Sequence, residues 1–288
     1  MIVTHIAGGM GNQMFQLAAG VALASRLGVE LRLDTRYYNR RIPVELDLRL
    51  QHFGHGAREA NPRDIPYLKG DTFGRFVGSK FHKPCLSAFN DMRLPYNPAF
   101  ETLGDDTYLK GYWQSERYYA GQEDKVRRAL TFVTPPNDEN ARALDVILSK
   151  PSVSLHIRRA AYVSVPKFNA IHGTCSPEYY AQAVEHIAAN MAEEPVFVAF
   201  SDEPDWVREN IKIPFELHVM GHNGGATNYE DLRLMSRCRH HIVANSSFSW
   251  WGAWLNPDPD KMVVAPERWF ADPSMQVHDI VPEDWIRM

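Results

Sequence analysis

The sequence predicts an α/β protein with two domains, each built on a mostly parallel sheet covered by helices. Its 288 residues suit two domains of ordinary size, and an apolar content of 44% is enough for two packed cores. A strand–helix–strand pattern opens the chain, and a second alternation of strands and helices begins after the Lys-Pro pair near position 150. We therefore expect one domain over residues 1–150 and another over residues 151–288.

The first half opens with strands at residues 2–7 and 30–34 on either side of a helix at residues 12–27. Apolar residues at helical spacing predict this helix, and Gly28 follows it where glycine commonly ends a helix. The turn before it, residues 8–13 (GGMGNQ), offers backbone amides and a helix start to an anion. The turn lacks the Lys and Ser/Thr of a Walker loop, and as a dinucleotide fingerprint it is incomplete. A tight turn that needs glycine for its backbone angles explains Gly9 and Gly11 equally well.

Amide side chains stand beside this turn and again further along the chain. Asn12 and Gln13 suit sugar hydroxyls or phosphate oxygens, although capping the helix is the simpler role for Asn12. Residues 107–119 begin as a strand and become an aromatic, polar loop that contains Trp113 and Gln114. Its aromatic rings fit either the protein core or a surface on which a sugar stacks, with Gln114 supplying hydrogen bonds.

The second half is organised around an apolar strand at residues 153–157 that leads directly into cationic residues. His156, Arg158 and Arg159 cluster at its carboxyl end, which is where ligands bind in open α/β sheets. Because side chains alternate along a strand, we expect one arginine to face a ligand and the other to pair with an acid. A surface arginine pair is the alternative. A polar loop follows, and Ser176 then caps the next helix.

Two later strands, at residues 195–200 and 240–244, also end in small polar residues. Ser201 and Asp202 follow the first strand, and Asp202 either caps the next helix or accepts hydrogen bonds from a base or ribose. A helix follows the second strand, and the N-terminus of this helix could hold phosphate. This start is made of Asn245, Ser246 and Ser247, and we expect the tryptophans after it to pack the helix into the domain.

Composition excludes several other classes of protein. A net charge of −4 gives no basic field to recruit nucleic acid. The three cysteines, Cys85, Cys175 and Cys238, lack metal-type spacing and indicate a reducing cytoplasm. The apolar runs are shorter than the roughly 20 residues of a membrane-spanning helix, so we expect a cytoplasmic protein and leave peripheral membrane contact open. The adjacent His240 and His241 do not fit a zinc site, and a serine-hydrolase elbow is missing.

Taken together, six segments in this order resemble the bacterial α-1,2-fucosyltransferases, the inverting family that also covers the vertebrate blood-group H enzymes. The resemblance spans nearly the whole chain. It depends on residues 8–16 (GGMGNQMFQ), 111–118 (GYWQSERY), 156–159 (HIRR), 172–175 (HGTC), 200–202 (FSD) and 245–255 (NSSFSWWGAWL).

The resemblance implies a GT-B type of fold, with two Rossmann-like domains and a cleft between them. Residues 1–150 would form the acceptor-side domain and residues 151–288 the domain that binds GDP-fucose. The implied reaction moves L-fucose from GDP-β-L-fucose to the 2-hydroxyl of a terminal galactoside, in glycan or O-antigen synthesis. Its partners would be GDP-fucose and a galactose-terminated oligosaccharide, with no nucleic acid, metal or cofactor.

The resemblance also assigns roles to individual residues. Arg158 and His156 would be catalytic, with Arg158 on the β-phosphate. The donor would be bound by Gly9, Gly11, Asn12, Gln13, Arg158, Ser201, Asp202, Asn245, Ser246 and Ser247, with Asn12 and Gln13 toward the sugar. The acceptor side would contain Gln114, Trp113 and His172.

One position departs from the family pattern. The family continues His-x-Arg-Arg with a small residue and then Asp, but this sequence has Ala160 and Ala161. If that carboxylate acts as general base, its loss slows the chemistry by roughly a hundred- to ten-thousand-fold. If it only braces Arg158, the affinity for the donor falls instead. Two other functions stay open: a non-catalytic protein that binds sugar nucleotides or glycans, and a GT-B transferase of another linkage.

Overall fold

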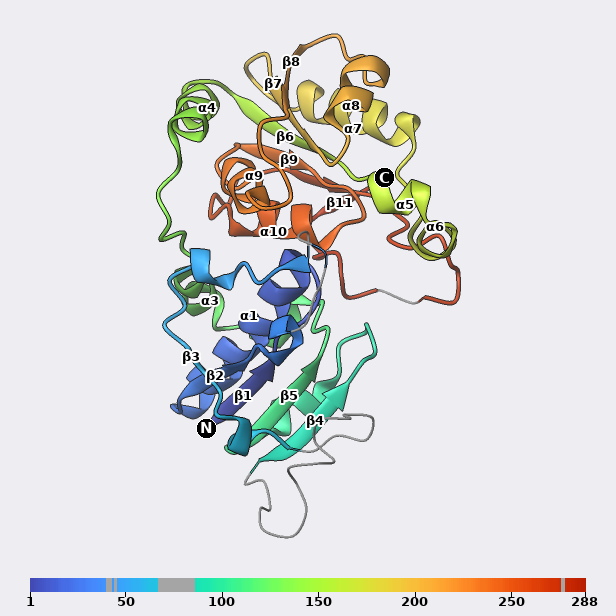
Figure 1. The fold of residues 1–288 in the computed structure, drawn as a ribbon. Coiled ribbons are helices and arrows are strands. Elements are labelled where there is room, and N and C mark those ends of the chain that lie inside the picture. The colour runs from blue at the N-terminus through green and yellow to red at the C-terminus, as the bar shows by residue number, and fades with distance from the viewer. Residues whose placement is uncertain (40–42, 44–45, 67–85, 276–277) are drawn as a thin grey trace. The chain divides into compact units, whose positions relative to one another are not determined.

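The computed structural model describes residues 1–288 except 40–42, 44–45, 67–85 and 276–277. The chain divides into two compact units (Figure 1). Unit 1 contains Met1–Val133 and His278–Ile280, and unit 2 contains Thr134–Val277 and Val281–Met288. This division falls before the helix at residues 138–149, whereas the sequence suggests a boundary near residue 150.

Unit 1 is built on a parallel sheet which, in the described residues, has five strands in the order β3-β2-β1-β5-β4. The central strand β1 is hydrogen-bonded on both sides, so its carboxyl end lies in the middle of one sheet edge. The strands are β1 (Ile2–His5), β2 (Leu31–Asp34), β3 (Arg58–Glu59), β4 (Ser87–Asp91) and β5 (Thr107–Gly111).

Helix α1 (Met10–Leu27) packs against this sheet and against α3 (Glu123–Ala129). Its first turns are buried almost all round, as expected for an apolar helix in a core. Gly28 ends it with a left-handed φ of 67°, which confirms the predicted stop. Short 3-10 helices connect the other elements: η1 (Arg36–Asn39), η3 (Leu50–His52), η4 (Pro62–Asp64), η5 (Pro98–Thr102) and η6 (Glu116–Tyr119).

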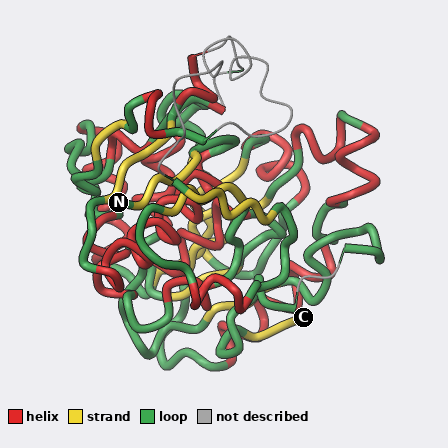
Figure 2. The backbone as a smooth tube through the Cα atoms, turned by 90° about the horizontal axis from the view of Figure 1, so that it is seen from below, coloured by secondary structure: helices red, strands yellow, loops and turns green. Residues whose placement is uncertain are grey.

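Unit 2 is built on a second parallel sheet, in the order β11-β10-β9-β6-β7-β8 over the residues described. The strand predicted around Val153 is one of its two central strands, and every residue of it is buried. The short strand β11 lies next to the C-terminus (Figure 2). The strands are β6 (Ser152–Ile157), β7 (Val196–Ser201), β8 (Glu216–Met220), β9 (His240–Ile242), β10 (Val263–Ala265) and β11 (Ile286–Arg287).

The helices of unit 2 agree with the sequence at most positions and differ at one. The prediction of a polar loop after the arginine pair is wrong. Two short helices occupy that segment, α5 (Ala160–Ser164) and α6 (Pro166–His172). The other helices are α4 (Asp138–Ser149), α7 (Pro177–Ala189), α8 (Pro204–Asn210), α9 (Asn228–Met235) and α10 (Ser247–Leu255).

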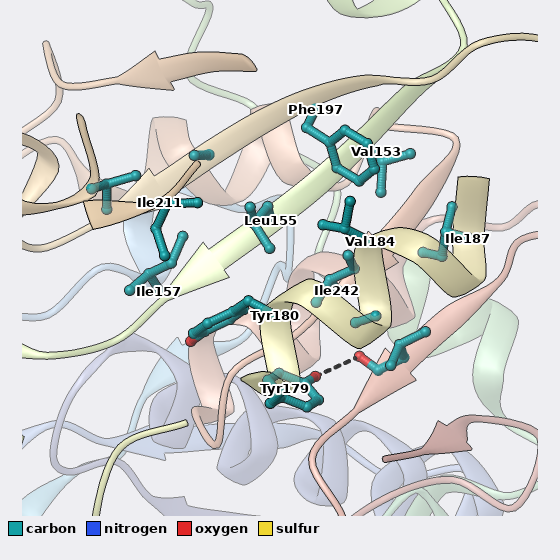
Figure 3. Packing of buried hydrophobic residues seen from close by; sticks show 14 residues of the cluster. Val153, Leu155, Ile157, Tyr179, Tyr180, Val184, Ile187, Phe197, Ile211 and Ile242 are labelled. Atoms are coloured by element: carbon teal, nitrogen blue, oxygen red, sulfur yellow. Dashed lines mark hydrogen bonds between the residues drawn. The ribbon is translucent and has the colours of Figure 1, made fainter. Parts of the chain in front are cut away.

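The core of unit 2 fixes the position of the sheet edge. Val153, Leu155 and Ile157 project from one face of β6 onto α7, where Tyr179 and Val184 are buried (Figure 3). Each such aliphatic side chain contributes about 1.5–3 kcal/mol when it is fully buried. The Tyr179 hydroxyl lies 2.6 Å from the Val243 carbonyl and 3.2 Å from the Val264 carbonyl, so α7 is attached to the chain after β9 and to β10. The carboxyl ends of these strands are therefore held on a rigid platform.

The tryptophans of α10 pack this helix into unit 2, as the sequence suggests. Trp250, Trp251 and Trp254 are all buried, and the rings of Trp250 and Trp254 stack with centroids 6.2 Å apart. Within the described part of the chain, no helix combines the length and apolar character needed to cross a membrane.

Candidate active site

The carboxyl edge of the second sheet brings together the residues that the sequence singles out in that half. Strands β6 and β9 are parallel neighbours, with Leu155 opposite Ile242. Arg158 and the start of α10 therefore lie at the same sheet edge. The His156 ring on β6 contacts the Phe248 ring on α10, with centroids 5.7 Å apart, so the two elements meet directly.

Arg158 is held by an acid from the neighbouring strand end. Its Nη1 lies 2.6 Å from Oδ2 of Asp202, and the other oxygen of Asp202 accepts the backbone N–H of Arg159 at 2.9 Å. Burial raises the pKa of Asp202, and the charge of Arg158 opposes that shift. The capping role suggested for Asp202 is wrong: Glu203 occupies the N-cap of α8, and Ser201 accepts the Glu203 N–H at 3.0 Å. The two hydrogen bonds of the Asp202 carboxylate are charge-assisted, and together they stabilise it more than a single helix cap would.

Arg159 pairs with a second acid. Its Nε donates to Glu203 at 2.9 Å, and its guanidinium lies 3.6 Å from the ring centroid of Trp206. The sequence led us to expect one arginine to pair with an acid, but β6 ends at Ile157 and both arginines pair with acids that follow β7. The Arg158 side chain remains one-third exposed and can reach a ligand.

His156 is a neutral, buried imidazole. Burial and the nearby charge of Arg158 lower its pKa to about 3. Within the described residues, its Nδ1 has no hydrogen-bond partner. A ring with this pKa does not carry protons near neutral pH, so His156 suits hydrogen bonding to a ligand better than proton transfer.

The start of α10 has the features of an anion site. Ser246 caps the helix, and its Oγ accepts the Phe248 N–H at 3.3 Å, while Ser247 is half-buried at the first helical position. Asn245 is committed to the protein, since its Nδ2 donates to the His172 carbonyl at 2.8 Å. Asn245 therefore braces the segment after α6, and the serines and helix amides remain the groups that suit phosphate oxygens.

His172 lies close to Arg158 through an aromatic neighbour. Its ring stacks on Tyr162, with centroids 4.5 Å apart and planes 6° from parallel. The Arg158 guanidinium lies 5.1 Å from the centroid of the same tyrosine. Burial and the charge of Arg158 lower the pKa of His172. The structure thus places this acceptor-side candidate beside the arginine.

In unit 1, the glycine turn forms the start of α1. Gly9 is the N-cap, Gly11 lies in the first turn, and Gly8 has a left-handed φ of 82° that favours glycine. The amide of Gln13 is used within the protein: Nε2 donates to the carbonyls of Gly8 and Asp47, and Oε1 accepts a backbone N–H. Gln13 therefore fastens the loop around Asp47 to the helix start.

Asn12 and Gln114 meet at the carboxyl edge of the first sheet. The Gln114 Nε2 donates to Asn12 Oδ1 at 2.7 Å and so connects the segments that follow β1 and β5. Trp113 is only 2% exposed and packs among Phe89, Phe100 and Tyr118. The core interpretation of Trp113 is therefore the one that the structure supports, and its ring is not a surface for sugar.

Three further residues have structural roles that the sequence did not reveal. Gln16 joins two strand ends, since it accepts the Ala7 N–H at 2.8 Å and donates to the Gly111 carbonyl at 3.2 Å. Asp231 on α9 accepts from Asn223 at 2.7 Å, and burial raises its pKa to about 7. Tyr162 joins Arg158 to His172. Asp231 lies in a segment that the sequence predicts as an amphipathic helix, and such a pattern does not reveal that one of its polar residues is buried. Of the three residues, only Gln16 belongs to a motif that the sequence analysis singled out.

Further observations concern possible metal ligands, the cysteines and the position of Ala161. Among the described residues, no three His, Cys, Asp or Glu side chains gather as metal ligands would. Cys238 is buried and Cys175 is half-buried, both with free thiols, and Cys85 lies outside the described residues. Ala161 is the second residue of α5, which begins directly after the arginine pair.

Comparison with known proteins agrees with these motifs. Residues 89–288 match the family described as Glycosyl transferase family 11. The chain is 30% identical to the α-1,2-colitosyltransferase of Escherichia coli, over all of this chain and 99% of that protein. It is 28% identical to the O-antigen biosynthesis glycosyltransferase WbnK of Escherichia coli, over 98% of this chain and 99% of that protein. It is 26% identical to galactoside α-(1,2)-fucosyltransferase 2 of Rattus norvegicus, over 88% of this chain and 67% of the relative.

Solved structures are similar in fold. The fucosyltransferase NodZ from Bradyrhizobium superposes with a TM-score of 0.52 at 13% identity, over 87% of this chain and 91% of that one. FUT1 from Arabidopsis thaliana, solved in complex with GDP, gives a TM-score of 0.53 at 12% identity, over 99% of this chain and 75% of that one. The α/β fold of GT-B type with Rossmann-like sheets is therefore confirmed, and this chain is a glycosyltransferase that belongs to glycosyl transferase family 11.

Proposed function

We propose that this protein transfers L-fucose from GDP-β-L-fucose to the 2-hydroxyl of a terminal galactoside, with inversion at the anomeric carbon. The observation that carries the proposal is the position of Arg158 and the start of α10 at one sheet edge, joined by the His156–Phe248 contact. The similarity to a galactoside α-(1,2)-fucosyltransferase and to a fold solved with GDP supports it.

The chemistry requires stabilisation of a leaving diphosphate. The acceptor oxygen forms a bond to the anomeric carbon while the bond from that carbon to the β-phosphate oxygen breaks, and GDP leaves with the electron pair. Arg158 supplies a fixed positive charge, and the amides at the start of α10 supply the positive end of a helix dipole. These groups act in place of a divalent cation, so the proposal includes no metal and no cofactor.

Asp202 would keep Arg158 in position before the donor binds. The ion pair is partly exposed, with the arginine one-third exposed, so a phosphate can approach the guanidinium without displacing buried groups. A guanidinium that is already oriented does not have to be reorganised during the reaction, which is how such sites lower a barrier.

Ala161 places a limit on the rate. The acceptor hydroxyl must lose a proton as it attacks; alanine offers no carboxylate at the start of α5 to receive it, so the proton passes to water. The proposal is therefore a competent donor site with slow transfer. The same geometry would serve a binding protein without turnover, which is the alternative that the missing carboxylate favours.

A second candidate donor has direct support. The relative that is 30% identical over the whole chain is an α-1,2-colitosyltransferase, so a colitosyl nucleotide is the competing substrate. In either case the residues around Arg158 would contact the diphosphate of the donor. The two candidate donors would therefore be distinguished by contacts with their sugar, fucose or colitose.

The test is product detection by mass spectrometry with GDP-fucose and with the corresponding colitosyl nucleotide, each against galactose-terminated oligosaccharides. Transfer of fucose supports the proposal if linkage analysis of the product shows that the 2-hydroxyl of the terminal galactoside carries the fucose. Transfer only from the colitosyl nucleotide replaces the donor. Binding of GDP by calorimetry without any product, for wild type and for Ala161→Asp, would identify a binding protein instead.

A further inference from the structure

We propose that the aromatic surface formed by Tyr162, His172, Phe168 and Phe270 binds the acceptor sugar, and that Phe168 determines how tightly the acceptor is held. This inference deepens the proposed function and rests on it for the position of the donor diphosphate. It names an acceptor subsite inside unit 2, formed by α5, α6 and the segment after β10.

The four rings form a continuous series that starts at the guanidinium. Arg158 lies 5.1 Å from the centroid of Tyr162, and Tyr162 stacks on His172 at 4.5 Å. From His172 the series branches to Phe270 at 5.3 Å and to Phe168 at 6.3 Å. Tyr162, His172 and Phe270 are half-buried, whereas Phe168 is 43% exposed. The series therefore runs outward from the candidate catalytic charge to an accessible ring.

Helices α5 and α6 expose apolar side chains to an unusual degree. Val163, Val165 and Phe168 are 45%, 38% and 43% exposed, and they lie within a single short stretch of chain. Most large apolar residues elsewhere in unit 2 are buried against the sheet. Exposed apolar groups gathered beside a charged site are typical of a ligand surface.

The surface is also held rigidly. Asn169 donates to the Tyr162 carbonyl at 2.7 Å and so fixes α6 to α5. The end of α6 is fixed by Asn245, which donates to the His172 carbonyl at 2.8 Å, and by Ala271, whose N–H donates to the Ile171 carbonyl at 3.0 Å. A surface fastened at both ends loses little entropy when it binds a ligand.

The chemistry of transfer determines which ligand this surface can contact. The attacked carbon is one bond from an oxygen of the β-phosphate, and Arg158 is the cation proposed to hold that phosphate. The acceptor ring must therefore lie within about one sugar ring of Arg158. Galactosides have one face rich in C–H groups, and such a face stacks on aromatic rings, whereas their hydroxyls remain free for hydrogen bonds. Tyr162 lies within this range of Arg158, at 5.1 Å, and His172 and Phe168 extend the aromatic surface outward from it, at 4.5 Å and then 6.3 Å between ring centroids.

The test compares three variants of the whole protein. Phe168→Ala removes the exposed ring, Phe168→Tyr keeps it, and Leu148→Ala removes a side chain that is 58% exposed on α4, away from the sheet edge. We expect Phe168→Ala to raise the acceptor KM about two- to tenfold, in line with the energy of one aromatic stacking contact. The Kd for GDP should stay unchanged, and the other two variants should resemble wild type.

Direct binding separates this inference from the proposed function. Saturation-transfer NMR with a β-galactoside and the GDP-loaded protein should show magnetisation reaching the sugar from aromatic protons, with a smaller effect in Phe168→Ala. This signal without fucosyl transfer would contradict the proposed function and support the subsite. Fucosyl transfer with equal acceptor KM in wild type and Phe168→Ala would overturn the subsite. So would loss of binding to phospholipid vesicles in Phe168→Ala with the acceptor KM unchanged, because the surface would then contact lipid.

Discussion

Arg158 and Asp202 form an ion pair of 2.6 Å that connects the ends of the parallel strands β6 and β7. The carboxylate also accepts the backbone N–H of Arg159, so one acid fixes both the side chain and the backbone at the start of the candidate site. This relationship orients a cation that an apo protein would otherwise leave mobile.

Replacing Asp202 should weaken the site without unfolding it. We expect Asp202→Asn to raise the Kd for GDP roughly tenfold, because Arg158 loses its orientation, and Arg158→Ala to lower kcat by about a hundred- to a thousandfold. Calorimetry with GDP and steady-state kinetics measure the two effects. Asp205→Asn is the matched control, since Asp205 lies on α8 with a side chain 92% exposed. Equal GDP affinity in Asp202→Asn and Asp205→Asn would contradict the proposed role of the pair.

Restoring a carboxylate at position 161 should accelerate transfer. If that carboxylate acts as the general base, Ala161→Asp should raise kcat by roughly a hundred- to ten-thousand-fold. The control is Ala160→Asp, which places the same charge at the preceding residue of α5. Identical turnover of GDP-fucose in wild type and Ala161→Asp would defeat the hypothesis that the missing acid limits the rate.

Acid should destabilise unit 2 through two buried histidines. His241 accepts or donates at Ser154 and Asn256 in the core, and burial lowers the pKa of His241 and of His156 to about 3. The unfolded chain, with a histidine pKa near 6.5, binds more protons than the folded chain between about pH 6.5 and 3. Stability is therefore complete above pH 6.5 and falls as the pH drops, by up to about 1.4 kcal/mol per histidine per pH unit.

Urea unfolding at pH 7 and pH 5 measures this effect. His241→Gln, which keeps hydrogen-bonding groups but does not titrate, should show a smaller loss between the two pH values than wild type. His218→Gln, at a partly exposed site, is the control. A pH dependence that is the same in wild type and His241→Gln would contradict the assignment for that residue.

Gln13 should affect stability more directly than donor binding. Gln13→Ala leaves the carbonyl of Asp47 and the N–H of Arg49 without their side-chain partner, at a cost of about 1–3 kcal/mol for each buried group that stays unsatisfied. Thermal unfolding measures the loss, and Gln51→Ala, at an exposed glutamine, is the control. Normal thermal stability with a weakened donor Kd would instead return Gln13 to the donor site.

Much of the local structure could be predicted because its causes are local. Ser176 caps α7 as expected, accepting the Tyr179 N–H at 3.2 Å, and Gly28 ends α1 in the left-handed conformation that glycine adopts without strain. The buried strand β6 followed from an apolar run, and the ordered set of motifs identified the family. The caps, the helix stop and the strand are each encoded by neighbours within a few residues, and each motif is itself a short local segment.

The sequence by itself therefore determined the fold class, most of the helices and strands, and the family. Only the tertiary structure decided which partner each polar group takes: Asp202 binds Arg158 instead of capping α8, Gln13 binds backbone groups near Asp47, and Tyr162 stacks on His172. The physical reason is that such partners are distant in sequence. A hydrogen bond or ring contact between them forms only after parallel strands have brought their carboxyl ends to one edge.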